Sequence, residues 1–545
     1  MTDRIRAALT RVAAELGMPE AEFVLERPRD NGHGDLATNL AMVLARPLRA
    51  NPRQLAQRVV DSLALPVGVI ERTEIAGPGF INFWLAPGQL NADLQAILAA
   101  GPSYGRHTVG QGTRVNVEFV SANPTGPLHV GHGRGAALGD AIATLLEWTG
   151  HEAVREFYIN DAGVQIDKLA RSLWARIQQG AGRKADLPEG GYHGEYLADL
   201  AAAVREREGV GFADLPESEG IVRAREIALR AMREEQDEDL RVFGVRFDVH
   251  TSEVELYHSG AVEHGLEVLR GKGLTYESDD ALWLRTTDFG DDKDRVLRKR
   301  DGTFTYLVPD VAYHVGKFER GFRHAIDVWG ADHHGYVPRM RAVLRALGYP
   351  DDFFDAKIVQ LVKVVRGGEE VRMSKRSGEF VTLRDLFEEV GVDAARYFFL
   401  MRRGESGLVF DVDLAKSQTE ENPVFYVQMA HARMSGIFRV AGRRPEDAMG
   451  DVMPEALPAD QDQELLKKLS AFPEVVLRAA QEREPHRITS YLEELARVAH
   501  GWYHHCRVLG EPPAVEHGRL LLARAARQVL ANGLTLLGCS APDRM

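Results

Sequence analysis

The sequence predicts a multidomain α/β protein in which a doubly wound parallel sheet lies between a small N-terminal α/β domain and an all-helical C-terminal domain. Three observations predict this class. Strand-like and helix-like patterns alternate over residues 111–403, which is typical of a parallel sheet covered by helices. Short strand-like runs follow an amphipathic helix within residues 1–110, and helical periodicity dominates residues 404–545. A chain of 545 residues has room for about three to five domains.

The composition excludes several classes of protein. Lys and Arg number 67 and Asp and Glu number 80, so the formal net charge is −13. This acidic total argues mildly against a nucleic-acid partner, although a local basic face is compatible with it. The two cysteines, Cys506 and Cys539, cannot make a disulfide framework or a four-thiolate zinc site, and they suit a reducing cytosol. Early charges and the lack of an apolar run of about 18 residues predict neither a signal peptide nor a membrane span.

The order of the elements follows from local patterns. Four apolar residues at helical spacing predict the first helix: Ile5, Leu9, Val12 and Leu16. Residues 79–85 alternate in the manner of a strand, and the glycine-rich residues 101–112 predict a boundary. In the central domain, a strand over 114–120 leads through a loop into a helix with a glycine-rich start, and residues 358–365 form a later strand-like run. The charged, helical residues near 165–241 predict an insertion into that domain.

The loop from Asn123 to His132 is the most informative segment. Two prolines stiffen it, Gly126 permits close approach of the backbone, and it ends at a helix N-terminus, which favours an anion. His129 and His132 lie three residues apart, so both can face one phosphate. Two other interpretations compete: a pair of capping or core histidines, and a dinucleotide fingerprint in residues 131–136. The glycines of a true fingerprint follow their strand directly, and here the proline loop intervenes.

A second polar segment runs from Val371 to Gly378. Ser374 and Lys375 lie in a cationic loop, which is either an ordinary solvated surface or a phosphate-binding element. The chain contains no P-loop motif. We expect no protein-bound zinc, because the neighbouring histidine pairs have no thiolate companions.

Together the two segments resemble the signature motifs of class I aminoacyl-tRNA synthetases. His129-Val-Gly-His132 differs from the usual H-I-G-H by one aliphatic residue. Arg372-Met-Ser-Lys-Arg376 keeps the central serine and lysine of K-M-S-K-S and has arginine at both ends. The resemblance implies a Rossmann-like, nucleotide-binding catalytic domain.

Further segments are similar to arginyl-tRNA synthetases of the bacterial kind, and they extend over essentially the whole chain. They are residues 34–39, 77–83, 118–134, 160–163, 393–398 (in place of the D-A-L-R signature) and 422–433. The resemblance implies ATP-dependent ligation of L-arginine to its tRNA through an arginyl-adenylate, with Mg²⁺ accompanying the ATP. It also implies that the N-terminal domain contacts tRNA and that the C-terminal helices bind the anticodon. We expect a cytoplasmic monomer with no membrane partner.

The resemblance assigns roles to individual residues. The expected catalytic residues are His129, His132 and Lys375. The expected ATP-binding residues are Pro124, Gly131, His132, His333, Met373, Ser374 and Lys375. The expected arginine-binding residues are Glu118, Asn123, Tyr306 and Asp310. A guanidinium presents donors in a planar fork that carboxylates match in pairs. Asp310 has an alternative interpretation, because it follows Pro309 at a helix start and would complement the helix dipole there.

Two other functions belong to different classes. One is a different enzyme of the same nucleotidyl-transfer superfamily, such as another synthetase or a cytidylyltransferase, although small transferases lack a helical C-terminal third. The other is a non-catalytic tRNA-binding paralogue, whose mark would be the loss of a signature histidine or of Lys375, and these are present. The resemblance makes several basic residues candidates for tRNA contacts: residues 293–300, Arg402, Arg403, Arg507, Arg519, Arg524 and Arg527.

Overall fold

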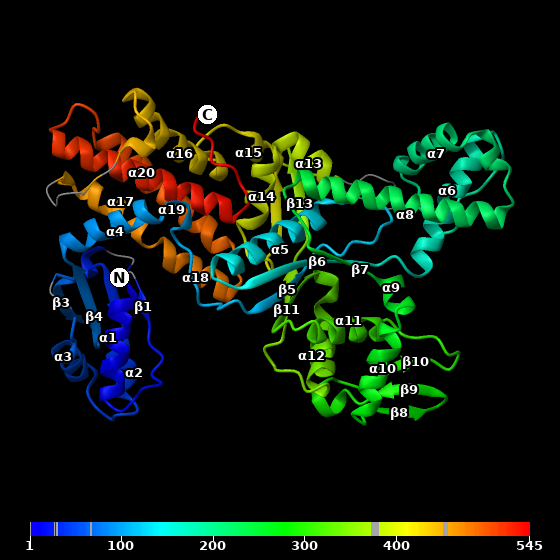
Figure 1. The fold of residues 1–545 in the computed structure, drawn as a ribbon, viewed down its shortest axis with the longest axis horizontal. Helices are drawn as coiled ribbons and strands as arrows, with labels where there is room; N and C mark the ends of the chain where they lie inside the picture. The colour runs from blue at the N-terminus through cyan, green and yellow to red at the C-terminus, as the bar shows by residue number, and fades with distance from the viewer. Residues whose placement is uncertain are drawn as a thin grey trace.

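A computed structural model of the chain describes residues 2–26, 28, 31–65, 68–371, 381–448, 450 and 456–545. In Figure 1 the N-terminal domain lies at the lower left, below the C-terminal helices, and the central domain occupies the middle and right. The signature loop, defined as residues 119–129, lies in the central domain.

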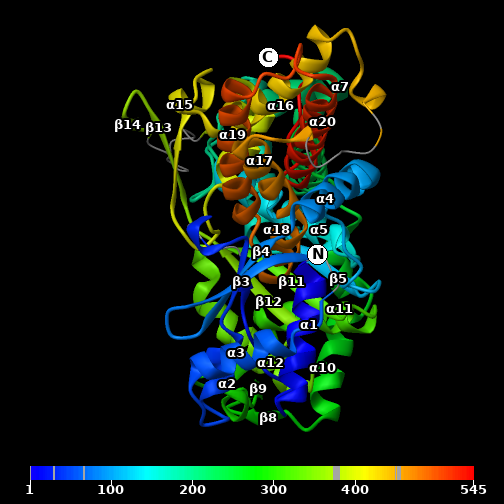
Figure 2. The ribbon, with the colours of Figure 1, turned by 90° about the vertical axis from the view of Figure 1, so that its left-hand side faces the viewer.

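The N-terminal domain is a four-stranded antiparallel sheet with strand order β1-β2-β4-β3. Its strands are β1 (Leu25–Glu26), β2 (Leu36–Thr38), β3 (Ile70–Ala76) and β4 (Phe80–Leu85). Its helices are α1 (Thr2–Glu15), η1 (Asn31–His33), α2 (Leu40–Ala45) and α3 (Pro52–Ser62). The apolar faces of these elements form a core of their own. Figure 2 shows the N-terminal domain below the C-terminal helices. An ion pair of 2.6 Å between Lys467 Nζ of α17 and Asp35 joins the two.

The central domain contains five parallel strands in the order β12-β11-β5-β6-β7. They are β5 (Arg114–Glu118), β6 (Glu152–Ile159), β7 (Val249–Ser252), β11 (His324–Gly330) and β12 (Phe354–Val359). The strand order reverses at β5, with β6 on one side and β11 on the other. Ligands of doubly wound sheets bind at the carboxyl ends of the strands beside such a reversal.

Helices join these strands on both faces of the sheet. The connecting helices are α5 (Val130–Trp148), α9 (Glu253–His258), α10 (Ala261–Gly271), α11 (Leu307–Glu319), η5 (Ala331–Tyr336) and α12 (Val337–Ala346). Between β6 and β7 the chain forms α6 (Val164–Gly180), α7 (Glu195–Glu208), η3 (Val210–Asp214) and α8 (Glu217–Val242). These four elements have a separate hydrophobic core and project at the right of Figure 1. We call them the helical insertion.

Two small sheets complete the central region. An antiparallel sheet between α10 and α11 consists of β8 (Thr275–Ser278), β9 (Ala281–Leu284) and β10 (Arg295–Arg298), with the short helix η4 (Thr287–Phe289) between β9 and β10. A second sheet has the order β14-β13-β15, formed by β13 (Val362–Arg366), β14 (Glu369–Glu370) and β15 (Leu408–Asp411). β15 lies within the range 404–545 and pairs in parallel with β13, so this range contains one short strand besides its helices.

The remaining elements are helical. They are α4 (Pro87–Ala100), η2 (Gly101–Ser103), α13 (Leu383–Val390), α14 (Val392–Leu400), α15 (Val412–Lys416), α16 (Pro423–Val440), η6 (Pro445–Asp447), α17 (Asp460–Ser470), α18 (Phe472–Glu482), α19 (His486–His505) and α20 (Pro513–Leu536). α4 follows the N-terminal sheet in sequence but packs on α17 and α20. None of the helices in the described part of the chain has the length and apolar character needed to cross a bilayer.

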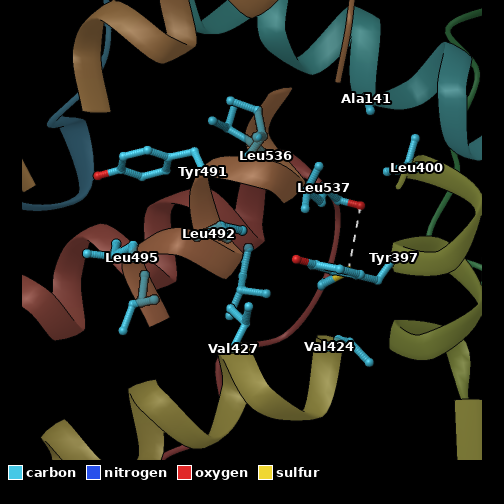
Figure 3. Close-up of a cluster of buried hydrophobic side chains, with 14 of the residues drawn as sticks. Ala141, Tyr397, Leu400, Val424, Val427, Tyr491, Leu492, Leu495, Leu536 and Leu537 are labelled. Carbon is cyan, nitrogen blue, oxygen red and sulfur yellow. Dashed lines mark hydrogen bonds between the residues drawn. The ribbon is translucent and has the colours of Figure 1, made fainter. Parts of the chain in front are cut away.

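One hydrophobic core runs from the central sheet into the C-terminal helices. Figure 3 shows part of it, where Tyr397 and Leu400 of α14 meet side chains of α5, α16 and α19 and the end of α20. Because one continuous cluster contains buried residues of both regions, the parallel sheet and the helical domain share a core.

Candidate nucleotide and amino-acid site

The signature loop begins with backbone in a conformation that L residues rarely adopt. Val120 has φ 67° and Ser121 has φ 42°, and a β-branched residue in this region is a genuine outlier. Ser121 is held on both sides: its Oγ donates to Glu118 at 2.9 Å and accepts the backbone N–H of Tyr158 at 3.3 Å. Strained backbone of this kind concentrates at functional sites. The strain therefore makes the carboxyl end of β5 a candidate site.

The two signature histidines cap the start of α5 and cap each other. His129 Nδ1 accepts the N–H of Gly131 at 3.1 Å and that of His132 at 3.4 Å, and His132 Nδ1 accepts the N–H of His129 at 3.3 Å. Their rings stack with centroids 3.7 Å apart. Because both Nδ1 atoms accept, the neutral rings carry their protons on Nε2. The capping and phosphate interpretations are therefore compatible, since capping orients the Nε2–H donors.

Gly131 and Gly133 keep space for this arrangement. A Cβ at residue 131 would lie 3.0 Å from the His129 ring, and one at residue 133 would lie 2.5 Å from Leu383. The backbone N–H groups at this helix start were expected to favour an anion, but those of Gly131 and His132 already bond to His129. The histidine rings, rather than these N–H groups, are what the helix start presents.

The second signature segment lies largely outside the described residues. This applies to Met373, Ser374 and Lys375, whose expected roles the structure leaves untested. On its C-terminal side, Thr382 forms a β-bridge with His129, and Leu383 N donates to Leu128 O at 2.7 Å. The residues directly after the second signature segment therefore lie beside His129 of the first one.

Glu118 lies in a buried network with one lysine at its centre. Lys317 Nζ is 2.7 Å from a Glu118 oxygen and 2.7 Å from Asp327, and His314 Nε2 is 2.9 Å from the other Asp327 oxygen. Burial acts to raise the pKa of Asp327, but Lys317 and His314 outweigh it and lower that pKa to about 2. Burial raises the pKa of Glu118 despite Lys317. Lys317 therefore already binds one Glu118 oxygen.

Two other carboxylates near the site have no such cation. Asp310 accepts a hydrogen bond from Tyr336 Oη, and burial raises the pKa of Asp310. Burial, with the negative charges of Asp310 and Asp161, raises the pKa of Glu253 to about 7. Within the described ranges, neither Glu253 nor Asp310 forms an ion pair with a lysine or arginine. Tyr158, at the carboxyl end of β6, has a raised pKa caused by burial and by both carboxylates.

Glu253 is a residue that the sequence analysis missed. It is the first residue of α9 and is 9% exposed, directly beyond the carboxyl end of β7. Asp161 fixes this helix start, accepting from Ser252 Oγ at 2.7 Å and from Val254 N at 3.0 Å. The available signal was Ser252, a capping residue immediately after a strand-like run.

The other expected site residues lie around this edge of the sheet. Asn123 is partly exposed, and its Nδ2 donates to Gln165 at 2.8 Å. Pro124 is buried in the signature loop. His333, in η5, interacts electrostatically with Asp310 and partly opposes the increase that burial causes in the pKa of Asp310. Tyr306, which precedes α11, is 87% exposed, so it does not pack against Asp310.

Several arginines considered for tRNA contact have structural partners. Arg295, Arg298 and Arg300 pair with acidic residues of the β8–β10 sheet. Arg519 is buried against Asp462, and Arg527 pairs with Asp543 at 2.9 Å. These ion pairs offset the positive charges of the five arginines. Arg402 and Arg403 are exposed, and Arg403 lies 3.5 Å from Glu484.

Comparison with known proteins matches the whole architecture. Residues 1–85 match the arginyl tRNA synthetase N terminal domain, 93–413 the catalytic domain of class I tRNA synthetases (R), and 427–545 the DALR anticodon binding domain. The chain is 48% identical to an arginine–tRNA ligase of Anoxybacillus flavithermus, covering 100% of this chain and 98% of that protein. The chain belongs to the arginyl-tRNA synthetase family.

Further relatives of the arginyl-tRNA synthetase family agree. The chain is 51% identical to an arginine–tRNA ligase of Syntrophotalea carbinolica over 96% of this chain and 95% of that protein. Among solved structures, arginyl-tRNA synthetase of Thermus thermophilus superposes with a TM-score of 0.78 at 26% identity, covering 99% of this chain and 100% of that one. The expected fold class is confirmed: a small α/β domain, a parallel catalytic sheet and a helical anticodon-binding domain.

Proposed function

We propose that L-arginine and ATP bind side by side at the carboxyl ends of β5, β6 and β7. The chain ligates arginine to its tRNA, and as a class I synthetase it uses ATP. The observation that carries the arginine site is the pair Glu253 and Asp310, two carboxylates with raised pKa values and no lysine or arginine partner within the described ranges. A guanidinium placed between them would supply the missing positive charge and donors in a planar fork.

The chemistry requires no protein nucleophile. An oxygen of the arginine carboxylate attacks the α-phosphorus of ATP, the bond to the bridging oxygen breaks, and pyrophosphate leaves with its electron pair. The Nε2–H groups of His129 and His132 then donate to phosphate oxygens, and Lys375 meets the charge that grows on the leaving group. A terminal hydroxyl of the tRNA next attacks the arginyl carbonyl and AMP leaves. Catalysis consists of positioning and charge stabilisation.

Magnesium enters this scheme with the nucleotide. Among the described residues, no group of three or more His, Cys, Asp or Glu is arranged to hold a metal ion. The phosphate oxygens of ATP are therefore its proposed ligands, as is usual for Mg²⁺ bound to nucleotides. We assign no protein residue to Mg²⁺ or to zinc.

We also propose the division of the chain and its state in the cell. The proposed domains are residues 1–110, residues 111–403 with a helical insertion near 165–241, and residues 404–545. The DALR domain binds the tRNA. In this proposal the N-terminal domain contacts the tRNA as well. We propose a cytoplasmic monomer. The two cysteines, both buried and unpaired, suit the reducing cytosol.

One assay tests this function. Total tRNA is incubated with the chain, ATP and each of the twenty amino acids in turn, and the aminoacylated tRNA is measured. Only arginine should be transferred. Transfer of another amino acid at a comparable rate would contradict the proposed site.

Replacing Asp310 with asparagine should weaken arginine binding by about tenfold to a hundredfold. A charge-assisted hydrogen bond contributes roughly 1.5–3 kcal/mol, and asparagine keeps an acceptor for Tyr336 while removing the charge. Calorimetric titration measures the affinity. Asp460→Asn is the matched control, because Asp460 is an exposed acid in the first turn of α17. If Asp310→Asn loses only thermal stability, Asp310 serves the helix dipole instead.

Arginine binding should strengthen as the pH rises through 7. The guanidinium of bound arginine requires an ionised Glu253. Because the pKa of Glu253 is about 7, the carboxyl group is mostly protonated below pH 7 and must release its proton when arginine binds. Affinity at pH 6 should be about tenfold weaker than at pH 8, with little change above pH 8. Titration in buffers of different ionisation enthalpy counts the released proton. Glu253→Gln should remove this pH dependence, and a persistent slope in that variant would exclude Glu253 as its source.

A further inference from the structure

The helical insertion contacts the signature loop through a buried glutamine. Gln236 lies on α8 and is 1% exposed. Its Nε2 donates to the carbonyl of Asn123 at 3.1 Å and to the carbonyl of Gly126 at 2.9 Å. One amide group therefore joins two points of the loop, on either side of Pro124.

The other two helices of the insertion contact the same loop. Tyr196 of α7 donates from its hydroxyl to the carbonyl of Thr125 at 2.7 Å. Gln165 of α6 accepts from the side chain of Asn123 at 2.8 Å. The consecutive carbonyls of Thr125 and Gly126 thus bond to different helices of one insertion.

α8 also contacts the helix that follows the second signature. Asp239, on the same face of α8 as Gln236, forms an ion pair with Arg384 in the first turn of α13. Asp239 is 1% exposed. A single turn of α8 therefore contacts the chain segments beside both signatures.

The core of the insertion does not include Gln236. That core is formed by apolar residues of α6, α7, η3 and the first part of α8. The Oε1 atom of Gln236 accepts no hydrogen bond from any residue in the described ranges, and a buried acceptor left in this way costs free energy. The stabilising contribution of Gln236 lies in its two bonds to the loop.

We propose that Gln236 is a positioning residue through which the helical insertion sets the geometry of the signature loop for adenylate formation. This inference rests on the proposed roles of Asn123 and Pro124 in holding arginine and ATP. The loop starts from strained backbone at Val120 and Ser121, so it needs external bonds to keep one conformation. When the bonds are lost, the two substrates lose alignment, which lowers turnover more than binding.

Gln236→Met tests the proposal, because methionine keeps the length and the burial but has no donor. In ATP–pyrophosphate exchange with tRNA present, kcat should fall by about tenfold to a hundredfold, since small misplacements of reacting groups cost that much. The KM for ATP should change less. Gln178→Met is the matched control: its Nε2 donates to Ala213 O at 2.9 Å inside the insertion, away from the loop. That variant should keep its kcat.

The outcomes separate a positioning role from a structural one. A Gln236→Met variant with a kcat within about twofold of the parent would overturn the proposal, whatever its unfolding temperature. If this variant does not fold, Tyr196→Phe decides: loss of the bond to Thr125 should lower kcat by about two- to tenfold, and an unchanged kcat would overturn it. His132→Ala tests the proposed function separately. Full activity in that variant would refute the proposed ATP site, on which the role of Gln236 rests. Reduced activity there with an unchanged Gln236→Met variant would refute only the role of Gln236.

Discussion

Replacing Lys375 with alanine should slow arginyl-adenylate formation by about 100- to 1,000-fold while arginine binding changes little. A cation that meets charge growing in the transition state contributes to turnover rather than to substrate binding. Lys375 lies outside the described residues, so the prediction rests on its place in the signature and on the chain beyond it. That chain returns to the first signature through the bridge between Thr382 and His129.

Single-turnover measurement of adenylate formation provides the test. Lys363→Ala is the control, because Lys363 is an exposed lysine of β13 whose ion pair with Glu370 spans 3.4 Å at the surface. Its removal should leave turnover unchanged, since such surface pairs contribute little. A Lys375→Ala variant that turns over within a factor of a few of the parent would refute the role.

Replacing Arg396 with alanine should lower the free energy of unfolding by about 3–5 kcal/mol, the usual cost of removing one partner of a buried ion pair. Its guanidinium is fully buried and donates to Asp140 at 2.6 Å and to the carbonyls of Phe243 and Leu537, each at 2.9 Å. These partners belong to α5, to the residue after α8 and to the residue after α20. Arg396 therefore joins α5, the helix that begins at the signature histidines, to the C-terminal helices.

Urea unfolding of the intact chain measures this loss. Arg402→Ala is the control. Arg402 is exposed just after α14, the helix that carries Arg396, and its replacement should change the free energy of unfolding by less than about 0.5 kcal/mol. A loss below about 1 kcal/mol for Arg396→Ala would show that the buried network reorganises around its absence.

Local patterns predicted the parts of the fold that depend on neighbours in sequence. The strand predicted over 114–120 ends at Glu118, two residues early, because the backbone turns to positive φ at Val120. The loop and the glycine-rich helix follow it, and the histidines lie at the helix start as their spacing indicates. The run 358–365 shows the limit of such patterns. It divides between β12 of the parallel sheet and β13 of another sheet, because apolar periodicity reports burial and not the identity of the neighbouring strand.

The electrostatics of the site depend on residues far apart in the chain. Glu118 was expected to bind the arginine substrate. Its pairing with Lys317 could not be read from the sequence, because the two residues are far apart in the chain and only the folded position of α11 brings Lys317 to Glu118. Glu253 was missed because its importance comes from Asp310 on a different helix. The first signature was accessible from sequence because its chemistry lies within ten residues.

The separate core of the N-terminal domain and the shared core of the other two regions have a mechanical consequence. Packed interiors resist deformation, so we expect the parallel sheet and the C-terminal helices to move together as one body. The N-terminal sheet has a core of its own, and it is joined to this body through Ala86, which precedes α4, and through the ion pair of Asp35 and Lys467. A rotation of that sheet would have to break this ion pair, but it would leave the packing around the stacked histidines at the start of α5 unchanged.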